Sequence, residues 1–183
     1  GVYDLEIDGK KMGDAYLAPG WTSYGNRVQY QTYDVTDFLQ EKTRVSLVVG
    51  NGWYAGYLNG EGEHHLYGKK TACIAMIRIT YEDGSVDVMG TDASWLVSEN
   101  AIRSSEIYMG ETLDLTLPLS DHYAGDTQAV LLERSAFPKR LISQEAEPIR
   151  ITKRFPVVQK ILTPKGELVF DFGQNMAGLV EVE

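Results

Sequence analysis

The sequence predicts an all-β fold, an antiparallel two-layer β-sandwich. Three observations support it: many short segments rich in β-branched and aromatic residues, hairpin-turn dipeptides between several of them, and one short helix signal. With 183 residues, 43% hydrophobic and 23% charged, the chain has room for one β-domain and a tail. We expect the core of the sandwich to span residues 1–118.

The first predicted hairpin lies at the start of the chain. Residues 2–7 alternate in side-chain type, and Asp8-Gly9 supplies the positive φ angles that a tight turn requires. Residues 36–40 carry the helix signal, a Thr or Asp cap followed by a single turn. An apolar strand over residues 44–49 follows and ends at Gly50-Asn51-Gly52.

A second hairpin is predicted in the middle of the chain, where Asp83-Gly84 turns a strand over residues 71–81 into one over 85–89. Further strands are predicted over residues 105–108, 113–117, 148–153, 160–162 and 168–172. Pro164-Lys165-Gly166 forms the turn before the last of these. The predicted core includes Val48, Ile74, Met76, Val88 and either Ile77 or Ile79. The choice between the last two depends on register, because a one-residue slip exchanges the faces of a strand.

Charge and composition exclude several functions. The net charge of −9 argues against nucleic acid as a partner, because phosphate binding needs clustered Lys and Arg. No apolar run approaches the ~20 residues of a membrane span. Cys73 is the single cysteine, so no disulfide is expected. Gly1 opens directly on a strand pattern, which suggests a piece excised from a longer protein.

Five motifs occur in a characteristic order: Ala18-Pro-Gly-Trp-Thr-Ser-Tyr24, Tyr30-Gln-Thr-Tyr-Asp-Val-Thr-Asp37, Gly50-Asn-Gly-Trp-Tyr-Ala-Gly56, Ile102-Arg-Ser-Ser-Glu-Ile-Tyr108 and Asp171-Phe-Gly-Gln-Asn-Met-Ala-Gly178. Together they resemble the N-terminal domain of bacterial α-L-rhamnosidases, inverting glycoside hydrolases that remove terminal L-rhamnose. The resemblance runs from Gly1 to about Asp114. It resumes at Asp171, which is similar to the opening of the next domain in these enzymes.

The resemblance implies a jelly-roll, galactose-binding-like sandwich with extra strands at its C-terminal end. It also implies that the catalytic carboxylates lie on a later helical barrel. We therefore expect no catalytic residue in this chain and no activity of the chain alone. Its partners would be the catalytic domain of the same polypeptide and rhamnosyl glycosides. The implied source is bacterial, and a cytoplasmic or a secreted location both stay open.

A domain boundary is predicted near residue 140. Composition shifts at Leu119 towards small and polar residues with weak periodicity, and strand character returns at Pro148. Residues 1–140 would form the N-terminal sandwich. Residues 141–183 would form a linker and the first strands of the following β-domain.

The predicted substrate-binding residues are Asn51, Trp53 and Tyr54. Sugar sites combine an aromatic face with a few fixed polar groups, and the flanking glycines would let a loop approach a ligand. The alternative is that Trp53 plugs the end of the sandwich. In some rhamnosidases such a domain binds rhamnose with calcium through an Asp-Asn pair. Gly50-Asn51 here lacks the carboxylate, so no cofactor is predicted, with calcium as the alternative.

No metal site is predicted. His64 and His65 are adjacent, and neighbouring residues of an extended strand point to opposite faces. Two functions stay open: a non-catalytic domain that packs on the catalytic domain, and an autonomous carbohydrate-binding module for L-rhamnose. The first predicts an exposed apolar patch, and the second a concave aromatic site at Trp53 and Tyr54.

Overall fold

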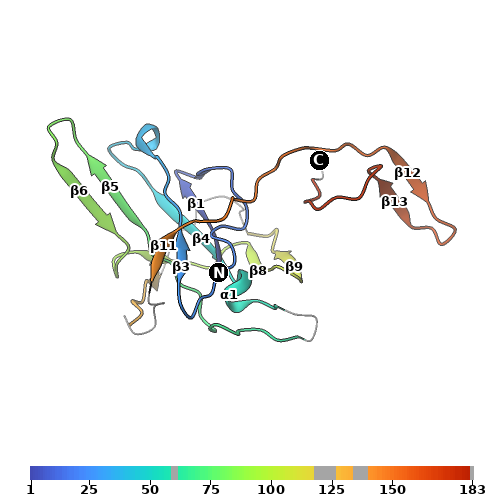
Figure 1. Ribbon diagram of the computed structural model, residues 1–183, viewed down its shortest axis with the longest axis horizontal. Coiled ribbons are helices and arrows are strands. Elements are labelled where there is room, and N and C mark those ends of the chain that lie inside the picture. Colours follow the sequence, from blue (N-terminus) through green and yellow to red (C-terminus); the bar gives the residue numbers. More distant parts are fainter. Residues whose placement is uncertain (59–61, 118–126, 134–139, 182–183) are drawn as a thin grey trace. The chain divides into compact units, whose positions relative to one another are not determined.

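The computed structural model describes residues 1–58, 62–117, 127–133 and 140–181 (Figure 1). They form two compact units, Gly1–Pro148 and Ile149–Glu183. Among the described residues, helical structure amounts to one 3₁₀ turn and one α-helical turn, and no helix is long and apolar enough to cross a membrane. The chain is therefore an all-β protein, and its first unit is a β-sandwich as the sequence predicts.

The centre of the first unit is a three-stranded antiparallel sheet in the order β2-β1-β4. Its strands are β1 (Val2–Ile7), β2 (Lys10–Lys11) and β4 (Val45–Gly50). β1 pairs with β4 along its whole length, with Leu5 opposite Leu47. The predicted turn between β1 and β2 is confirmed, because Asp8 and Gly9 have φ angles of 47° and 77°. Positive φ at both turn residues matches the twist of the flanking strands.

Three further antiparallel pairs surround this sheet. They are β5 (Met76–Thr80) with β6 (Val86–Gly90), β8 (Ile102–Glu106) with β9 (Gly110–Leu113), and β7 (Leu96–Val97) with β10 (Thr127–Gln128). Gly84, at a φ of 83°, turns β5 into β6 where the sequence predicts it. β5 begins later than the predicted residue 71. β8 and β9 begin earlier than the predicted 105 and 113, because the turn between them ends at Gly110, whose φ is 77°.

The strands β3 (Val28–Tyr30) and β11 (Leu141–Ser143) form a parallel pair. Side chains extend this pairing: Gln31 Nε2 donates to Gln144 Oε1 at 3.0 Å, and the Tyr3 hydroxyl donates to Gln31 Oε1 at 2.6 Å. The pairing places residues 141–143 in the first unit, bonded to a strand more than a hundred residues earlier. Parallel strands need a long connection, so no local sequence pattern predicts this pair.

The predicted single helical turn is confirmed as the 3₁₀ turn η1 (Thr36–Phe38). Asp34 stabilises its start, because Asp34 Oδ1 accepts hydrogen bonds from the Thr36 backbone N–H at 3.1 Å and from the Thr36 hydroxyl at 2.7 Å. These two bonds hold the pKa of Asp34 below its usual value.

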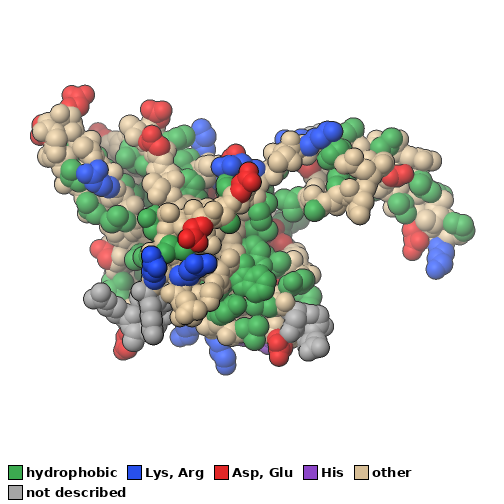
Figure 2. Space-filling view, in the orientation of Figure 1, with side chains coloured by type: hydrophobic (Ala, Val, Ile, Leu, Met, Phe, Trp, Pro, Cys, Tyr) green, Lys and Arg blue, Asp and Glu red, His purple; other side chains and the backbone are tan. Residues whose placement is uncertain are grey.

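The buried core is small. Among the described residues, its apolar members are Ile7, Met12, Ala18, Tyr24, Ala55 and Ala101. Three residues predicted for the core are instead exposed: Ile74 by 64%, Met76 by 70% and Val88 by 58%. The other three are half-buried: Val48, Ile77 and Ile79. Groups of hydrophobic side chains are accordingly visible on the face of the molecule that Figure 2 shows.

The core prediction is wrong for β5 and β6 because each pairs only with the other among the described strands. The two strands are exposed except at Ile77 and Ile79, which are half-buried. Ile77 and Ile79 share one face of β5 and are better buried than Met76 on the opposite face. The register therefore buries both isoleucines partly, rather than one of them completely.

The second unit contains one hairpin, β12 (Gln159–Leu162) with β13 (Leu168–Asp171), turned at Gly166 with a φ of 83°. This agrees with the predicted strands and turn. No strand forms over the predicted residues 148–153. Every residue of both strands is exposed, including Leu168 by 56% and Phe170 by 46%.

Candidate functional site

The motif after β4 forms a single helical turn, α1 (Gly52–Ala55), where the sequence predicts a loop. Gly52 has a φ of 48°, and a Cβ atom there would lie 2.7 Å from Cγ1 of Val2 and 2.8 Å from its backbone nitrogen. No larger residue fits this close approach. The glycine therefore lets α1 pack on β1 and does not hold space open for a ligand.

A carboxylate from β8 fixes α1 in place. Glu106 Oε1 accepts a hydrogen bond from Asn51 Nδ2 at 2.9 Å, and Glu106 Oε2 accepts one from the Tyr57 backbone N–H at 3.1 Å. Both oxygens of one carboxylate thus bind the two ends of the turn. Sequence reasoning missed this role of Glu106, because it lies 55 positions from Asn51.

Trp53 and Tyr54 are both half-buried on α1. The Tyr54 ring meets the edge of the Tyr24 ring at 5.2 Å between centroids and an angle of 75°. A Cβ atom at Gly68 would collide with the Tyr54 hydroxyl, so this hydroxyl packs directly on the chain. Tyr54 is therefore part of an internal aromatic contact.

That contact belongs to a larger aromatic cluster, defined as Trp21, Tyr24, Tyr54 and Tyr67. Tyr24 lies between Tyr54 and Tyr67, with its centroid 4.9 Å from that of Tyr67. Trp21 Nε1 donates a hydrogen bond to the Tyr67 hydroxyl at 3.3 Å. Sequence reasoning used Trp21 and Tyr24 to establish the resemblance and did not consider them as a site. The spacing of two aromatics three residues apart was the available signal.

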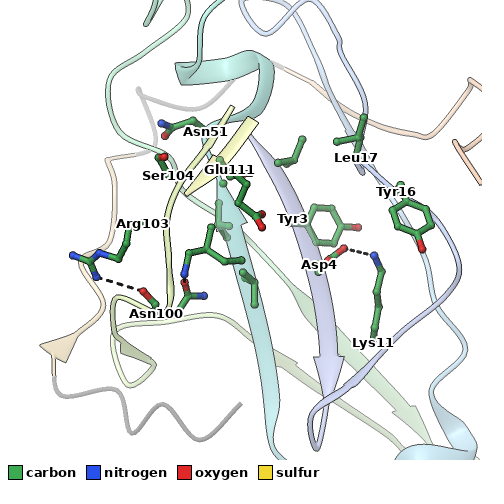
Figure 3. Close-up of a pocket in the computed structure, with 16 residues that line it drawn as sticks. Tyr3, Asp4, Lys11, Tyr16, Leu17, Asn51, Asn100, Arg103, Ser104 and Glu111 are labelled. Carbon is green, nitrogen blue, oxygen red and sulfur yellow. Dashed lines mark hydrogen bonds and ion pairs between the residues drawn. The ribbon is translucent and has the colours of Figure 1, made fainter. Parts of the chain in front are cut away.

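A cleft of about 330 Å³ lies beside β1, β4 and β8. Figure 3 shows Tyr3, Asp4, Lys11 and Tyr16 on one side and Asn51, Asn100, Arg103 and Ser104 on the other. Asn51 is thus the one predicted substrate-binding residue that lines this cleft, and Trp53 and Tyr54 do not line it. Their assignment as sugar contacts stays a prediction.

Internal ion pairs engage most charges of the cleft. Lys11 Nζ lies 2.7 Å from Asp4 Oδ1 and 4.6 Å from the centre of the Tyr16 ring. Arg103 Nη2 lies 2.6 Å from Glu99 Oε2. The walls otherwise combine amide and hydroxyl groups with apolar side chains and the Glu111 carboxylate, and such a mixed lining suits a small polar ligand.

The described residues contain no group of three or more His, Cys, Asp or Glu side chains that could hold a metal ion. His64 and His65 do not point to opposite faces as predicted, since their ring centroids lie 4.3 Å apart. The reason is the φ of 60° at His65, which departs from extended geometry. His64 also packs on Tyr57, with ring centroids 4.9 Å apart.

Comparison with known proteins gives one family match. Residues 1–153 match the family model described as "Alpha-L-rhamnosidase N-terminal domain". Two curated relatives match over the whole of this chain: the alpha-L-rhamnosidase of Streptomyces avermitilis, 35% identical over 189 residues, and that of Alteromonas sp., 28% identical over 192 residues. The chain spans 18% and 21% of the length of these relatives.

Solved structures show the same similarity. Streptomyces avermitilis alpha-L-rhamnosidase complexed with L-rhamnose superposes with a TM-score of 0.83 and 34% identity, over 96% of this chain and 18% of that one. Native alfa-L-rhamnosidase from Aspergillus terreus gives a TM-score of 0.84 and 31% identity, over 96% of this chain and 21% of that one.

Proposed function

This chain belongs to the family of α-L-rhamnosidase N-terminal domains, and on that premise we propose that it is a non-catalytic β-sandwich. In this proposal it packs on the catalytic domain of the same polypeptide and helps that domain to recognise rhamnosides. Hydrolysis is the work of the catalytic domain.

The exposed surface of the chain carries the proposal. The accessible area is 14284 Å² for 183 residues. An autonomous protein of this length exposes about 9,000 Å², and two separate units of the observed sizes would expose about 10,000 Å². The excess of roughly 4,000 Å² is larger than a typical interface between two domains. A chain with this much surplus surface fits a domain that is covered by neighbours.

The surplus surface is apolar in several places. Exposed large hydrophobic side chains in and beside the β5–β6 and β8–β9 hairpins include Ile74, Met76, Val88, Met89, Tyr108, Met109 and Leu115. Large apolar side chains that stay exposed on an isolated domain are typical of surfaces that contact a neighbour. It therefore supports the packing role over that of an autonomous module.

The cleft supports the non-catalytic part of the proposal. Inverting glycosidases need two carboxyl groups roughly 6.5–9.5 Å apart, one as acid and one as base. The cleft is lined by two carboxylates, Asp4 and Glu111, and Asp4 is held by Lys11. Its mixture of polar and apolar walls suits contact with a sugar, and the Streptomyces avermitilis relative crystallised with L-rhamnose makes rhamnosides the first ligand to test.

Calorimetric titration with L-rhamnose, with and without calcium, separates the two candidate functions. A packing domain should give no calcium-dependent heat and no affinity near 1 μM, a level that requires about −8 kcal/mol of binding free energy. Micromolar, calcium-dependent binding that Asn51→Ala abolishes would contradict the proposal and establish an autonomous module. Asn175→Ala, in the second unit, is the matched control.

A further inference from the structure

The outer half of the aromatic cluster is exposed. Trp21 exposes 53% of its surface and Tyr67 exposes 38%. The hydrogen bond from Trp21 Nε1 to the Tyr67 hydroxyl joins two segments 46 positions apart. An exposed indole is usually free to rotate, whereas this one is tethered by its own N–H. The two side chains therefore form one surface feature with a defined orientation.

The inner half of the cluster supports the outer half. Tyr24 is buried, at 7% exposure, and lies under Tyr67 with an angle of 56° between the rings. Tyr54 in turn meets the Tyr24 ring edge-on. Burial raises the pKa of Tyr24 to about 12, so its phenol stays neutral at physiological pH. The outer pair thus has a rigid and uncharged base.

The polarity of the Trp21–Tyr67 bond leaves a donor available. The Tyr67 oxygen accepts the indole proton and keeps its own O–H. No acceptor for this proton occurs among the bonds of the described residues. An aromatic face beside a fixed O–H donor is the combination that a sugar ring needs. The ring's C–H face lies on the indole, and one of its oxygens accepts from the tyrosine.

The segment carrying Trp21 has incomplete internal bonding. Thr22 and Tyr24 are each 7% exposed, and their buried hydroxyl oxygens have no hydrogen-bond partner in the described part of the structure. A buried polar group without a partner destabilises a fold, so such groups require an explanation. The segment that carries Trp21 is therefore not optimised for stability alone.

We propose that Trp21 and Tyr67 form a platform that binds the apolar face of a neutral pyranose ring, separately from the cleft at Asn51. No Lys or Arg belongs to the cluster, and the net charge of −9 disfavours anionic sugars. An open platform suits a glycoside that lies across it better than a small sugar that must be enclosed. The choice of rhamnosides as the first probe depends on the proposed function, whereas the platform itself does not.

The test is a titration of the full chain in which NMR monitors the resonances of the tryptophan indole N–H groups. Methyl α-L-rhamnoside and methyl α-D-glucoside are the two probes, and they distinguish a rhamnose-specific from a general pyranose platform. The expected result is weak binding, with a dissociation constant on the order of 1 mM, that shifts the Trp21 resonance. Trp21→Ala should weaken binding by about tenfold.

Two variants make the result specific. Tyr67→Phe keeps the ring and removes the hydroxyl, and it should weaken binding about two- to fivefold. Trp95→Ala removes an indole outside the cluster and should leave the affinity unchanged. Failure of the folded chain to bind either probe overturns the platform, and so does binding that Trp21→Ala leaves intact. Neither result bears on the proposed non-catalytic role, because that role is tested separately by a hydrolysis assay.

Discussion

Glu106 is the residue on which the geometry of α1 depends most directly. In Glu106→Gln one side-chain position becomes an NH₂ group, which cannot accept from both Asn51 and Tyr57. Loss of one charge-assisted bond should lower the free energy of unfolding by about 1–2 kcal/mol, measured by urea denaturation. Glu82→Gln, at an exposed position, is the control. Equal effects of the two variants would show that the two hydrogen bonds of Glu106 do not contribute to the free energy of unfolding.

Trp53→Ala tests how far this indole belongs to the core. Because Trp53 is half-buried, the cost should be about 2 kcal/mol, below the ~3–5 kcal/mol of a fully buried aromatic. Thermal and urea unfolding measure the change. If stability stays near wild type while rhamnose binding disappears, Trp53 is a sugar contact after all. A loss of stability above about 4 kcal/mol would instead show that the Trp53 indole is part of the core at the end of the sandwich.

The residues of the site illustrate what a sequence can predict. Asn51, Trp53 and Tyr54 lie in one short motif, and the sequence shows that the motif is unusual. It does not show that Glu106 binds Asn51 across 55 positions, or that Tyr67 binds Trp21 across 46. Such partners are chosen by strand pairing and packing, which no local pattern encodes.

At the scale of elements, the β1–β2 hairpin depends on its two-residue turn. Gly9 has a φ of 77°, which an L side chain adopts with strain. Gly9→Ala should cost about 1 kcal/mol in urea denaturation. Gly25→Ala is the control, because Gly25 has no positive φ and a Cβ there would meet no atom within 4 Å. A Gly9 variant as stable as the Gly25 variant would contradict this account of the turn.

Hairpins were predictable because their turn signals are local. Asp8-Gly9, Asp83-Gly84 and Pro164-Lys165-Gly166 all stand between paired strands. The burial of faces was less predictable, as Met76 and Val88 show. An apolar residue on a strand becomes core only when another layer covers it, and Met76 and Val88 stay exposed in the described chain. The β3–β11 pair was not predicted, because its two strands are distant in sequence.

At the scale of the whole molecule, the second unit has little of its own to stabilise it. Its one hairpin has four residues in each strand, and two-stranded hairpins are marginal in water. Trypsin should therefore cleave at exposed sites such as Lys160 and Lys165 well before it cuts at Lys11 in β2 of the central sheet. Mass spectrometry of a timed digest measures the order of cleavage. Equal resistance of both units in a monomer would contradict this.

The central proposal is that this α-L-rhamnosidase N-terminal domain is non-catalytic. The most direct test is an assay of aryl α-L-rhamnoside hydrolysis by the purified chain, in which release of the chromophore is measured. The account predicts no release above that of buffer at any pH, because inversion needs a free acid and base pair and, of the two carboxylates that line the described cleft, Asp4 is already paired with Lys11. Turnover that rises with protein concentration, and that Asp4→Asn or Glu111→Gln abolishes, would contradict it.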